Sequence, residues 1–344
     1  MLDNQAVEAN GRLLGLEHPG TLSAMHTLGN VYFEEQKFEQ AEAMFAHELE
    51  IRRRVSGVEH PATIAAIVNL GAVYMAQAKR AQAEELMSQA IEVSRRVLGP
   101  EHPSTVACMN NLANVYDQLG MYPQAEALHI QVLDIRRRTL RPGHPLILEA
   151  MHGLAWTYTA DGRYTDAMKL LVETIEGERR ALGPDHPETL SSTADAGFLY
   201  QQQGKYDVAA QYAAQALSGR RRALGSKNSD TMDSAADLAL AYLSQGKFAQ
   251  SESVAREAVE FDRAKRPDDW QRFRAESLLG ASLAGQQKYA EAEPLLLEGY
   301  RGMIARKDKI DVPYFCHFDR AREWLIQLYG AWGKPEKAAE FRSK

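Results

Sequence analysis

The stretch "LGPEHPSTVACMNNLANVYDQLG", residues 98–120, opens with a phrase that recurs along the chain. "LGPDHPETL" stands at residues 182–190, and "LEHPGTL" stands at residues 16–22. The histidine–proline pairs of this phrase return every 42 residues, at His18, His60, His102, His144 and His186. A fixed period of roughly 20 to 50 residues indicates a stack of equal structural units that each contact only their neighbours.

One unit, residues 101–142, reads as two helices joined by a tight turn. Apolar and small residues recur at helical spacing from Val106 to Tyr116, and Gly120 interrupts them. Pro123 suits the first turn of a second helix, where its missing N–H leaves no hydrogen bond unmade. Because a residue before proline avoids the helical region, each histidine of the recurring pairs is expected to be the last residue before a helix.

The turn between the two helices of a unit usually carries a glycine. It stands at Gly120, Gly162, Gly204, Gly246 and Gly333. Gln36, Ala78 and Gln287 take its place in three other units. We expect these turns to be strained or differently shaped, because glycine alone adopts a left-handed backbone without steric cost. Glycine also ends most of the long second helices, as a left-handed cap requires, although Arg141 and Pro267 replace it in two units.

This register resembles the tetratricopeptide repeat. The pattern shared with that family is found at Leu112, Ala113, Tyr116, Gly120 and Ala125. The 42-residue spacing and the "LGxxHPxTL" joint are similar to the kinesin light chain subtype. The resemblance implies an all-α, right-handed superhelical solenoid of antiparallel helix pairs, in which the first helix of each pair lines a concave groove. The last units also resemble arrays that follow signalling domains in bacterial proteins.

The ends of the chain depart from the repeat. Residues 1–15 align with the second helix of a unit, so we expect a truncated leading repeat there. Residues 16–304 are assigned to seven tandem repeats, and residues 305–344 to a linker and a divergent C-terminal capping helix pair. Three apolar residues of the leading half-unit would lack a partner helix, namely Val7, Leu13 and Leu14. Because exposed apolar patches associate, self-association through the truncated N-terminal end is expected.

The composition is that of an ordinary folded protein, with 45% hydrophobic and 25% charged residues. The net charge of −6 provides no general attraction to nucleic acid or to an anionic membrane. The sequence contains no apolar run long enough to span a membrane and no signal peptide pattern at its start. Its two cysteines, Cys108 and Cys316, fit a reducing compartment, so we expect a cytoplasmic location.

The sequence carries no recognisable catalytic motif. Serine hydrolase, zinc protease, nucleotide-binding and kinase motifs are all absent from it. The recurring histidines occur once per unit without a second ligand at a suitable spacing, so we interpret them as caps and not as metal ligands. Cys108 is expected to be a buried, inert thiol. We therefore predict that the chain is not an enzyme and requires no cofactor or metal.

Arginine recurs near the end of each second helix. The first arginine of each unit stands at Arg53, Arg95, Arg137, Arg179, Arg221 and Arg263. Acidic residues precede the neighbouring second arginines by four residues, at Glu50, Glu92, Asp134 and Glu176. That order favours ion pairs along a helix, so we expect pairs such as Glu50–Arg54 and Asp134–Arg138. The alternative, a basic stripe that follows nucleic acid phosphates, fits poorly with the negative net charge.

The positions expected to face the groove vary more than the rest of the unit. The candidate ligand-binding residues are His26, Asn30, Asn69, Asn110, Asn111, Asn114, His152, Trp156, Phe198 and Leu240. The N-terminal ones are mainly amides, which can both donate to and accept from a peptide backbone. Trp156 and Phe198 are either exposed anchors for a ligand or residues that fill space between helices. A clamp for a terminal carboxylate is not expected, because Arg274 is the one cation assigned to this face.

These patterns predict a non-catalytic protein–protein interaction module that binds a peptide or protein segment in its groove. The resemblance to bacterial arrays suggests a scaffold or regulatory part of a signalling protein. The alternative is a small-molecule sensor or an enzyme built in the groove. That alternative requires a closed pocket with at least two convergent ionisable groups, which the sequence alone does not assemble.

Overall fold

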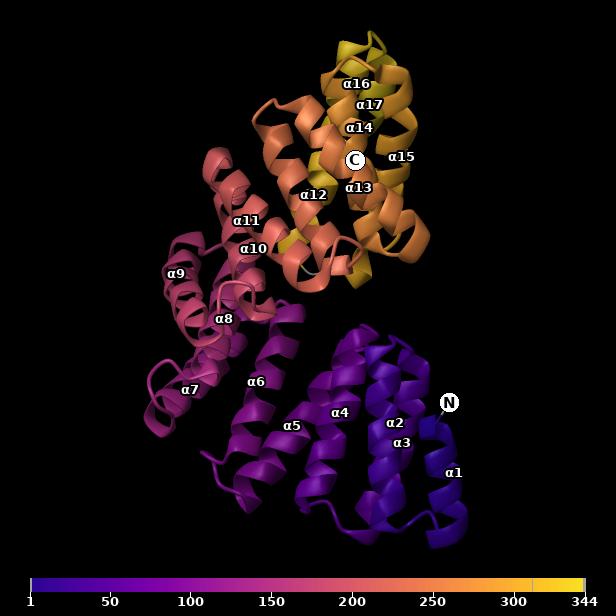
Figure 1. Cartoon of the computed structure of the whole chain (residues 1–344), viewed down its shortest axis with the longest axis vertical. Helices are drawn as coiled ribbons and strands as arrows, with labels where there is room; N and C mark the ends of the chain where they lie inside the picture. The colour runs from indigo at the N-terminus through magenta and orange to yellow at the C-terminus, as the bar shows by residue number, and fades with distance from the viewer. Residues whose placement is uncertain (1, 311, 343–344) are drawn as a thin grey trace. The chain divides into compact units, whose positions relative to one another are not determined.

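The computed structural model describes residues 2–310 and 312–342. Within these residues the regular elements are α-helices and two short 3-10 helices, as Figure 1 shows. The chain divides into two compact units, unit 1 at residues 1–140 and unit 2 at residues 141–344. The prediction of an all-α fold built from antiparallel helix pairs is confirmed in both units.

Unit 1 contains one helix followed by three helix pairs. Its helices are α1 (Leu2–Leu14), α2 (Pro19–Glu34), α3 (Phe38–Val55), α4 (Pro61–Ala76), α5 (Arg80–Val97), α6 (Pro103–Gln118) and α7 (Tyr122–Thr139). α1 packs against the first pair, because Val7 is partly buried against a core cluster of Leu22, Met25 and Ile51.

Unit 2 contains four helix pairs, a segment with short 3-10 helices and a last pair. Its elements are α8 (Pro145–Ala160), α9 (Tyr164–Ala181), α10 (Pro187–Gln202), α11 (Tyr206–Leu224), α12 (Ser229–Ser244), α13 (Phe248–Lys265), α14 (Trp270–Gly285), α15 (Tyr289–Ile304), η1 (Lys307–Lys309), η2 (Val312–Phe315), α16 (Cys316–Ala331) and α17 (Pro335–Arg342). A buried cluster that includes Leu278, Leu296 and Tyr329 connects the last repeat to this final pair.

Each histidine of the recurring pairs caps the helix that follows it. Its Nδ1 accepts a hydrogen bond from the backbone N–H two residues further on, at 3.1–3.3 Å. The capping histidines are His18, His60, His102, His144 and His186. Since an amide at the start of a helix has no partner within the helix, this bond satisfies a group that would otherwise stay unpaired. The interpretation of these histidines as caps is confirmed.

A buried threonine closes the same joint from the other side. In five joints its hydroxyl donates to the carbonyl of the glycine six residues earlier, at 2.8–2.9 Å. These threonines are Thr21, Thr63, Thr105, Thr189 and Thr231, each fully buried. The glycine has a left-handed backbone, so the joint fixes both the end of one helix and the start of the next.

The joint at the boundary of the two units has a different sequence. Arg141 replaces the glycine of the other joints, and Ile147 replaces the threonine. Leu140, at the end of α7, is extended, with φ −118° and ψ 156°. The left-handed position moves to Gly143, with φ 76°. The boundary between the two units therefore falls at a joint without the threonine–glycine bond. The joint before α14 also lacks this bond, because Pro267 replaces the glycine there and no threonine follows it.

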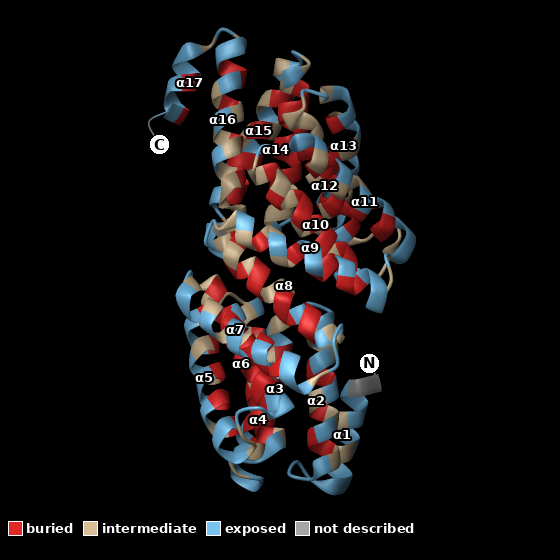
Figure 2. Cartoon of the chain, turned by 90° about the vertical axis from the view of Figure 1, so that its left-hand side faces the viewer, coloured by how far each residue is buried: buried red, intermediate tan, exposed pale blue. Residues whose placement is uncertain are grey.

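Small residues set the spacing within the helix pairs. A Cβ added to Gly29 would lie 2.7 Å from the ring of Phe45, and one added to Gly71 would lie 2.6 Å from the end of Met87. Contacts this short require the neighbouring side chain to move. In Figure 2 the buried residues lie along the sides of the helices that face other helices of the same unit.

The arginines pair with different partners from those expected. In four repeats, the second of the two neighbouring arginines contacts the acidic residue that precedes the capping histidine of the same repeat, at 2.6–2.7 Å. The pairs are Arg54–Glu17, Arg96–Glu59, Arg138–Glu101 and Arg222–Asp185. The expected pair along the helix is found at Arg138 and Asp134, 3.2 Å apart, in addition to the contact with Glu101. The prediction of structural ion pairs is thus right about the role of these arginines and mostly wrong about the partner.

The turns without glycine keep the shape of the glycine turns. Gln36, Ala78 and Gln287 have φ values of 59°, 58° and 64°, close to the 72° of Gly120. The turn is closed by a backbone bond from the next residue to the carbonyl of the recurring tyrosine, as from Lys37 to Tyr32 at 2.8 Å. Because that bond requires the left-handed residue, the three turns are strained and not differently shaped.

We therefore predict that Gln287→Gly increases the free energy of unfolding by about 1 kcal/mol. The left-handed conformation costs a residue with a Cβ roughly 1–2 kcal/mol, and the greater freedom of glycine in the unfolded chain offsets part of this gain. Chemical denaturation measures the change, and Gly246→Ala, at an equivalent turn, should have the opposite sign. Equal or lower stability of Gln287→Gly would show that the turn carries no strain.

Candidate functional site

The first helices of neighbouring repeats form the inner surface of each unit. α4 contacts α6 in unit 1, and α12 contacts both α10 and α14 in unit 2. A ligand in the groove would therefore contact the residues of the first helices that lie between the points where these helices touch.

In unit 1 the inner surface presents amides and one histidine. Asn30 and Asn114 are exposed, while Asn69 and Asn111 are partly buried. Asn110 is only 8% exposed, so its side chain lies mostly within the helix packing. The inner surface of unit 1 therefore combines two fully accessible amides with partly accessible neighbours.

His26 of unit 1 lies between two neighbouring helices. Its ring nitrogens lie 3.4 Å from the amide nitrogen of Asn69, 43 residues further along the chain. Its Nδ1 also lies 3.4 Å from the carboxylate of Glu48, which is fully buried. The histidine side chain is 33% exposed, so one part of the ring remains available on the inner surface.

In unit 2 the equivalent histidine has an acidic partner. His152 Nε2 lies 2.6 Å from Asp195, again 43 residues further on. Burial lowers the pKa of His152, but the hydrogen bond and the charge of Asp195 outweigh this, so its pKa is raised above the ordinary value. The same register therefore gives a neutral amide partner in unit 1 and a carboxylate in unit 2.

The aromatic residues of unit 2 contact a tyrosine from the C-terminal segment. The ring centroid of Tyr314, in η2, lies 5.6 Å from that of Trp156 and 5.4 Å from that of Phe198. Trp270 lies 5.5 Å from the same ring, and His317 stacks on it at 6.0 Å. Trp156 and Phe198 therefore pack against a residue of the chain itself in this structure.

Leu240 occupies the next position in the same register. It is 3% exposed and belongs to a buried cluster with Ala236 and Leu279. Its side chain therefore offers almost no surface to a ligand. It packs against neighbouring residues, as large apolar residues at helical spacing usually do.

A cavity of 180 Å³ in unit 2 brings charged groups next to these aromatic rings. The charged lining residues are Asp195, Asp230, Asp233, Asp237, Arg220 and Arg274. Arg274 is 5% exposed and pairs with Asp237. Its buried Nε has no hydrogen-bond partner among the described residues. The convergence of these charged groups was not identified from the sequence. A signal was present, because Asp195 and Asp237 stand at the same repeat positions as the candidate residues Asn69 and Asn111.

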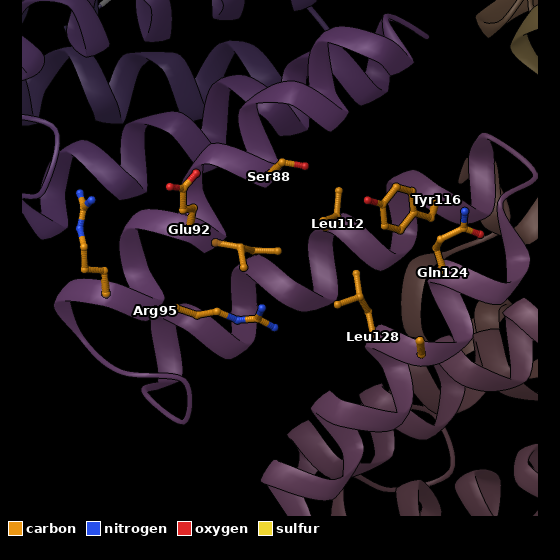
Figure 3. Close-up of a pocket in the computed structure, with 10 residues that line it drawn as sticks. Ser88, Glu92, Arg95, Leu112, Tyr116, Gln124 and Leu128 are labelled. Atoms are coloured by element: carbon orange, nitrogen blue, oxygen red, sulfur yellow. The ribbon is translucent and has the colours of Figure 1, made fainter.

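A second cavity lies between α5, α6 and α7 in unit 1, as Figure 3 shows. Its volume is 710 Å³, and its floor includes Ile91, Leu112 and Leu128. Glu92 and Arg95 of α5 lie at its polar edge. This cavity could not be predicted from the repeat pattern, because its apolar residues stand at positions where other repeats also carry core residues.

Other candidate features of the sequence have ordinary structural roles. Cys108 is 1% exposed, and burial raises the pKa of its thiol, so the thiolate that nucleophilic chemistry requires is disfavoured. In residues 2–310 and 312–342, no group of three or more histidine, cysteine or acidic side chains is placed to hold a metal ion. None of the helices in that part of the chain combines the length and apolarity that crossing a membrane requires.

The first helix presents part of the expected apolar patch. Leu13 is 82% exposed and Leu14 is 48% exposed, as is Leu16 at 50%. Val7, in contrast to the expectation, packs against the first helix pair. The accessible patch is therefore restricted to the end of α1 and the residues that follow it.

Comparison with known families gives a match over most of the chain. A family model described as tetratricopeptide repeat matches residues 1–54, 21–92, 62–138, 110–177, 161–222 and 195–264. No curated protein sequence matches the chain.

Several solved structures share the fold. A putative kinesin light chain of Podosopora anserina with nearly identical TPR-like repeats is 28% identical, with a TM-score of 0.51 over 60% of this chain and 98% of that chain. The apo form of the quorum sensor NprR from B. thuringiensis is 15% identical, with a TM-score of 0.66 over 99% of this chain and 93% of that chain. A Rap protein complexed with Competence and Sporulation Factor is 14% identical, with a TM-score of 0.55 over 98% and 95%.

Association through the exposed end of α1 remains a prediction. If Leu13 and Leu14 form an interface between two copies, the sedimentation coefficient should rise with protein concentration. Leu13→Glu should abolish this rise, because it places a charge in the patch. A chain that sediments as a monomer at every concentration would contradict the prediction.

Two histidines of unit 2, His152 and His317, are expected to change the stability of the fold with pH in opposite directions. Burial, together with the positive charges of Arg274 and Arg320, lowers the pKa of His317 well below its usual value. Below about pH 6.5 the unfolded state therefore binds a proton that the folded state resists, so the contribution of His317 to stability falls as the pH falls. The raised pKa of His152 has the reverse effect, since its contribution is present below that pH and is lost as the pH rises through the raised value.

We expect His317→Phe to lose less stability than the unaltered chain on acidification. Denaturant midpoints between about pH 7.5 and about pH 5.5, on either side of the ordinary histidine pKa, measure this difference. Phenylalanine keeps a ring for stacking and removes the titration, and His102→Asn serves as a control at an exposed cap. Parallel pH dependence of His317→Phe and the unaltered chain would exclude the proposed effect of His317.

Proposed function

Because the chain belongs to the tetratricopeptide repeat family, we propose that it is an interaction module that binds a peptide or protein segment on its inner surface. The repeat fold is generally a non-catalytic scaffold for protein interaction, which supports this proposal. The likeness in fold to a quorum sensor and to a Rap protein in complex with a factor supports a scaffold or regulatory role in bacterial signalling.

The accessible amides of unit 1 are the observation that carries the proposal. Asn30 and Asn114 stand at equivalent repeat positions and are exposed, whereas the residues that pack the repeats together are buried. An amide can donate to a peptide carbonyl and accept from a peptide N–H at the same time. With the partly buried Asn69 and Asn111, amides are present on α2, α4 and α6. Amides placed in this way suit an extended backbone, whose hydrogen-bonding groups recur regularly.

A small-molecule sensor is the second candidate function. The cavity of unit 2 supplies what the sequence alone did not, namely convergent ionisable groups such as Asp195, Asp237 and Arg274. A compound with both a positive and a negative group would match this set of charges.

The test uses peptides selected from a displayed library against the full chain. We expect Asn30→Ala and Asn114→Ala each to weaken binding about fivefold, as the loss of one hydrogen bond worth about 1 kcal/mol predicts. Titration calorimetry measures the affinities, and circular dichroism checks that the helices remain. Glu50→Ala, at an exposed position of the second helix α3, is the control and should leave affinity unchanged.

Two outcomes would contradict the proposed location. Peptides that lose affinity only in Leu128→Ala would bind the cavity between α5, α6 and α7. Selection that yields no binding peptide, together with small-molecule binding that Arg274→Gln abolishes, would favour the sensor. The signalling role is tested separately by sequencing the gene on both sides of the region that encodes this chain. A signalling domain is expected there, and an unrelated catalytic domain would contradict the signalling role.

A further inference from the structure

The C-terminal segment of unit 2 crosses the inner surface of that unit. Tyr314 contacts Trp156 of α8, Phe198 of α10 and Trp270 of α14, three helices from three different repeats. The three ring centroids lie 5.4–5.6 Å from that of Tyr314. Distances and angles in this range are those that aromatic pairs prefer, and such pairs stabilise beyond the area they bury.

The register of the repeat identifies this place as the position of a groove ligand. Trp156 and Phe198 stand at the same repeat position as Asn30 and Asn114, the exposed amides of unit 1. In unit 1 that position faces outward from the helix packing. In unit 2 it contacts Tyr314, which comes from a segment outside the repeats, so the tyrosine occupies the place of a bound side chain.

The site has apolar walls and a polar end. Trp270 and Phe198 line the cavity on the side of the tyrosine ring, and Asp237 and Arg274 line it as well. Tyr314 itself lines the same cavity, next to these charged residues. An apolar body with a polar tip matches tyrosine better than it matches an aliphatic side chain.

The segment that carries Tyr314 is attached to the repeats on both sides of the tyrosine. Ile310 is 2% exposed and enters the buried cluster of the last repeats. Gln202 of α10 donates to Cys316 Sγ at 3.3 Å and accepts from Arg320 at 3.2 Å. The 3-10 helix η2 has only four residues, and such turns have poorer hydrogen-bond geometry than an α-helix.

From these contacts we infer that Trp156, Phe198 and Trp270 form a binding site for a tyrosine of a partner peptide, which Tyr314 fills as an internal competitor. This inference rests on the proposed function and gives unit 2 a ligand class of its own. A tethered competitor acts at a high effective concentration, so it reduces the apparent affinity for the partner in proportion to the fraction of sites that it fills. Removal of the tyrosine should therefore open the site.

The probe is a synthetic peptide with the sequence of residues 310–318, "IDVPYFCHF". We expect Tyr314→Ala to bind it at least tenfold more tightly than the unaltered chain, as followed by the fluorescence of Trp156 and Trp270. A peptide with alanine in place of its tyrosine should bind neither chain. Phe315→Ala is the matched control, because Phe315 contacts Phe318 and Lys307 of its own segment and should leave the site filled.

A second measurement does not depend on the folding of the variant. In the unaltered chain, excess peptide should increase the hydrogen exchange of the backbone at residues 312–316, because it displaces this segment. Equal peptide affinity of the two chains, a folded Tyr314→Ala that does not bind, or binding without increased exchange would overturn the inference. These outcomes are independent of Asn30 and Asn114, so failure of this site and failure of the unit 1 surface can be told apart.

Discussion

The structure depends on one joint, which is repeated with little change. A glycine carbonyl accepts from a buried threonine, and a histidine ring accepts from the first turn of the next helix. These bonds satisfy groups that a helix end leaves unpaired, and they fix the angle at which each helix pair follows the last. Two joints lack the threonine–glycine bond, and at one of them, with Arg141 and Ile147, the two compact units meet in sequence.

Because the joint is nearly constant, the position of a residue within its repeat determines which residue of the next repeat it contacts. His26 and Asn69 of unit 1, and His152 and Asp195 of unit 2, are pairs with the same 43-residue separation. The packing is shared between the two pairs, but the chemistry differs, because the inner positions are free to vary. Unit 1 presents open amides there, whereas unit 2 presents a charged cavity and a tyrosine site that the chain itself occupies.

The sequence was sufficient to predict the helices and the chemistry of their ends. The helices, the capping histidines and the strained turns at Gln36, Ala78 and Gln287 follow from spacing and backbone chemistry. Partners that lie in a joint or outside the repeats were not predictable in this way. The carboxylate partner of Arg96 lies 37 residues away, in the joint, and Tyr314 reaches Trp156 from a segment without repeat pattern. Such contacts require the fold, since neither helical spacing nor composition relates the residues involved.

The central claim is that the tyrosine of the C-terminal segment fills the ligand position of unit 2. Nuclear Overhauser effects between ring protons test it most directly, in a chain with carbon-labelled aromatic residues. If Tyr314 fills this position, effects are expected from its ring to Trp156, Phe198 and Trp270, whose ring centroids lie 5.4–5.6 Å away. A Tyr314 ring with the signals of a solvent-exposed tyrosine, and with no effect to any of the three rings, would contradict it.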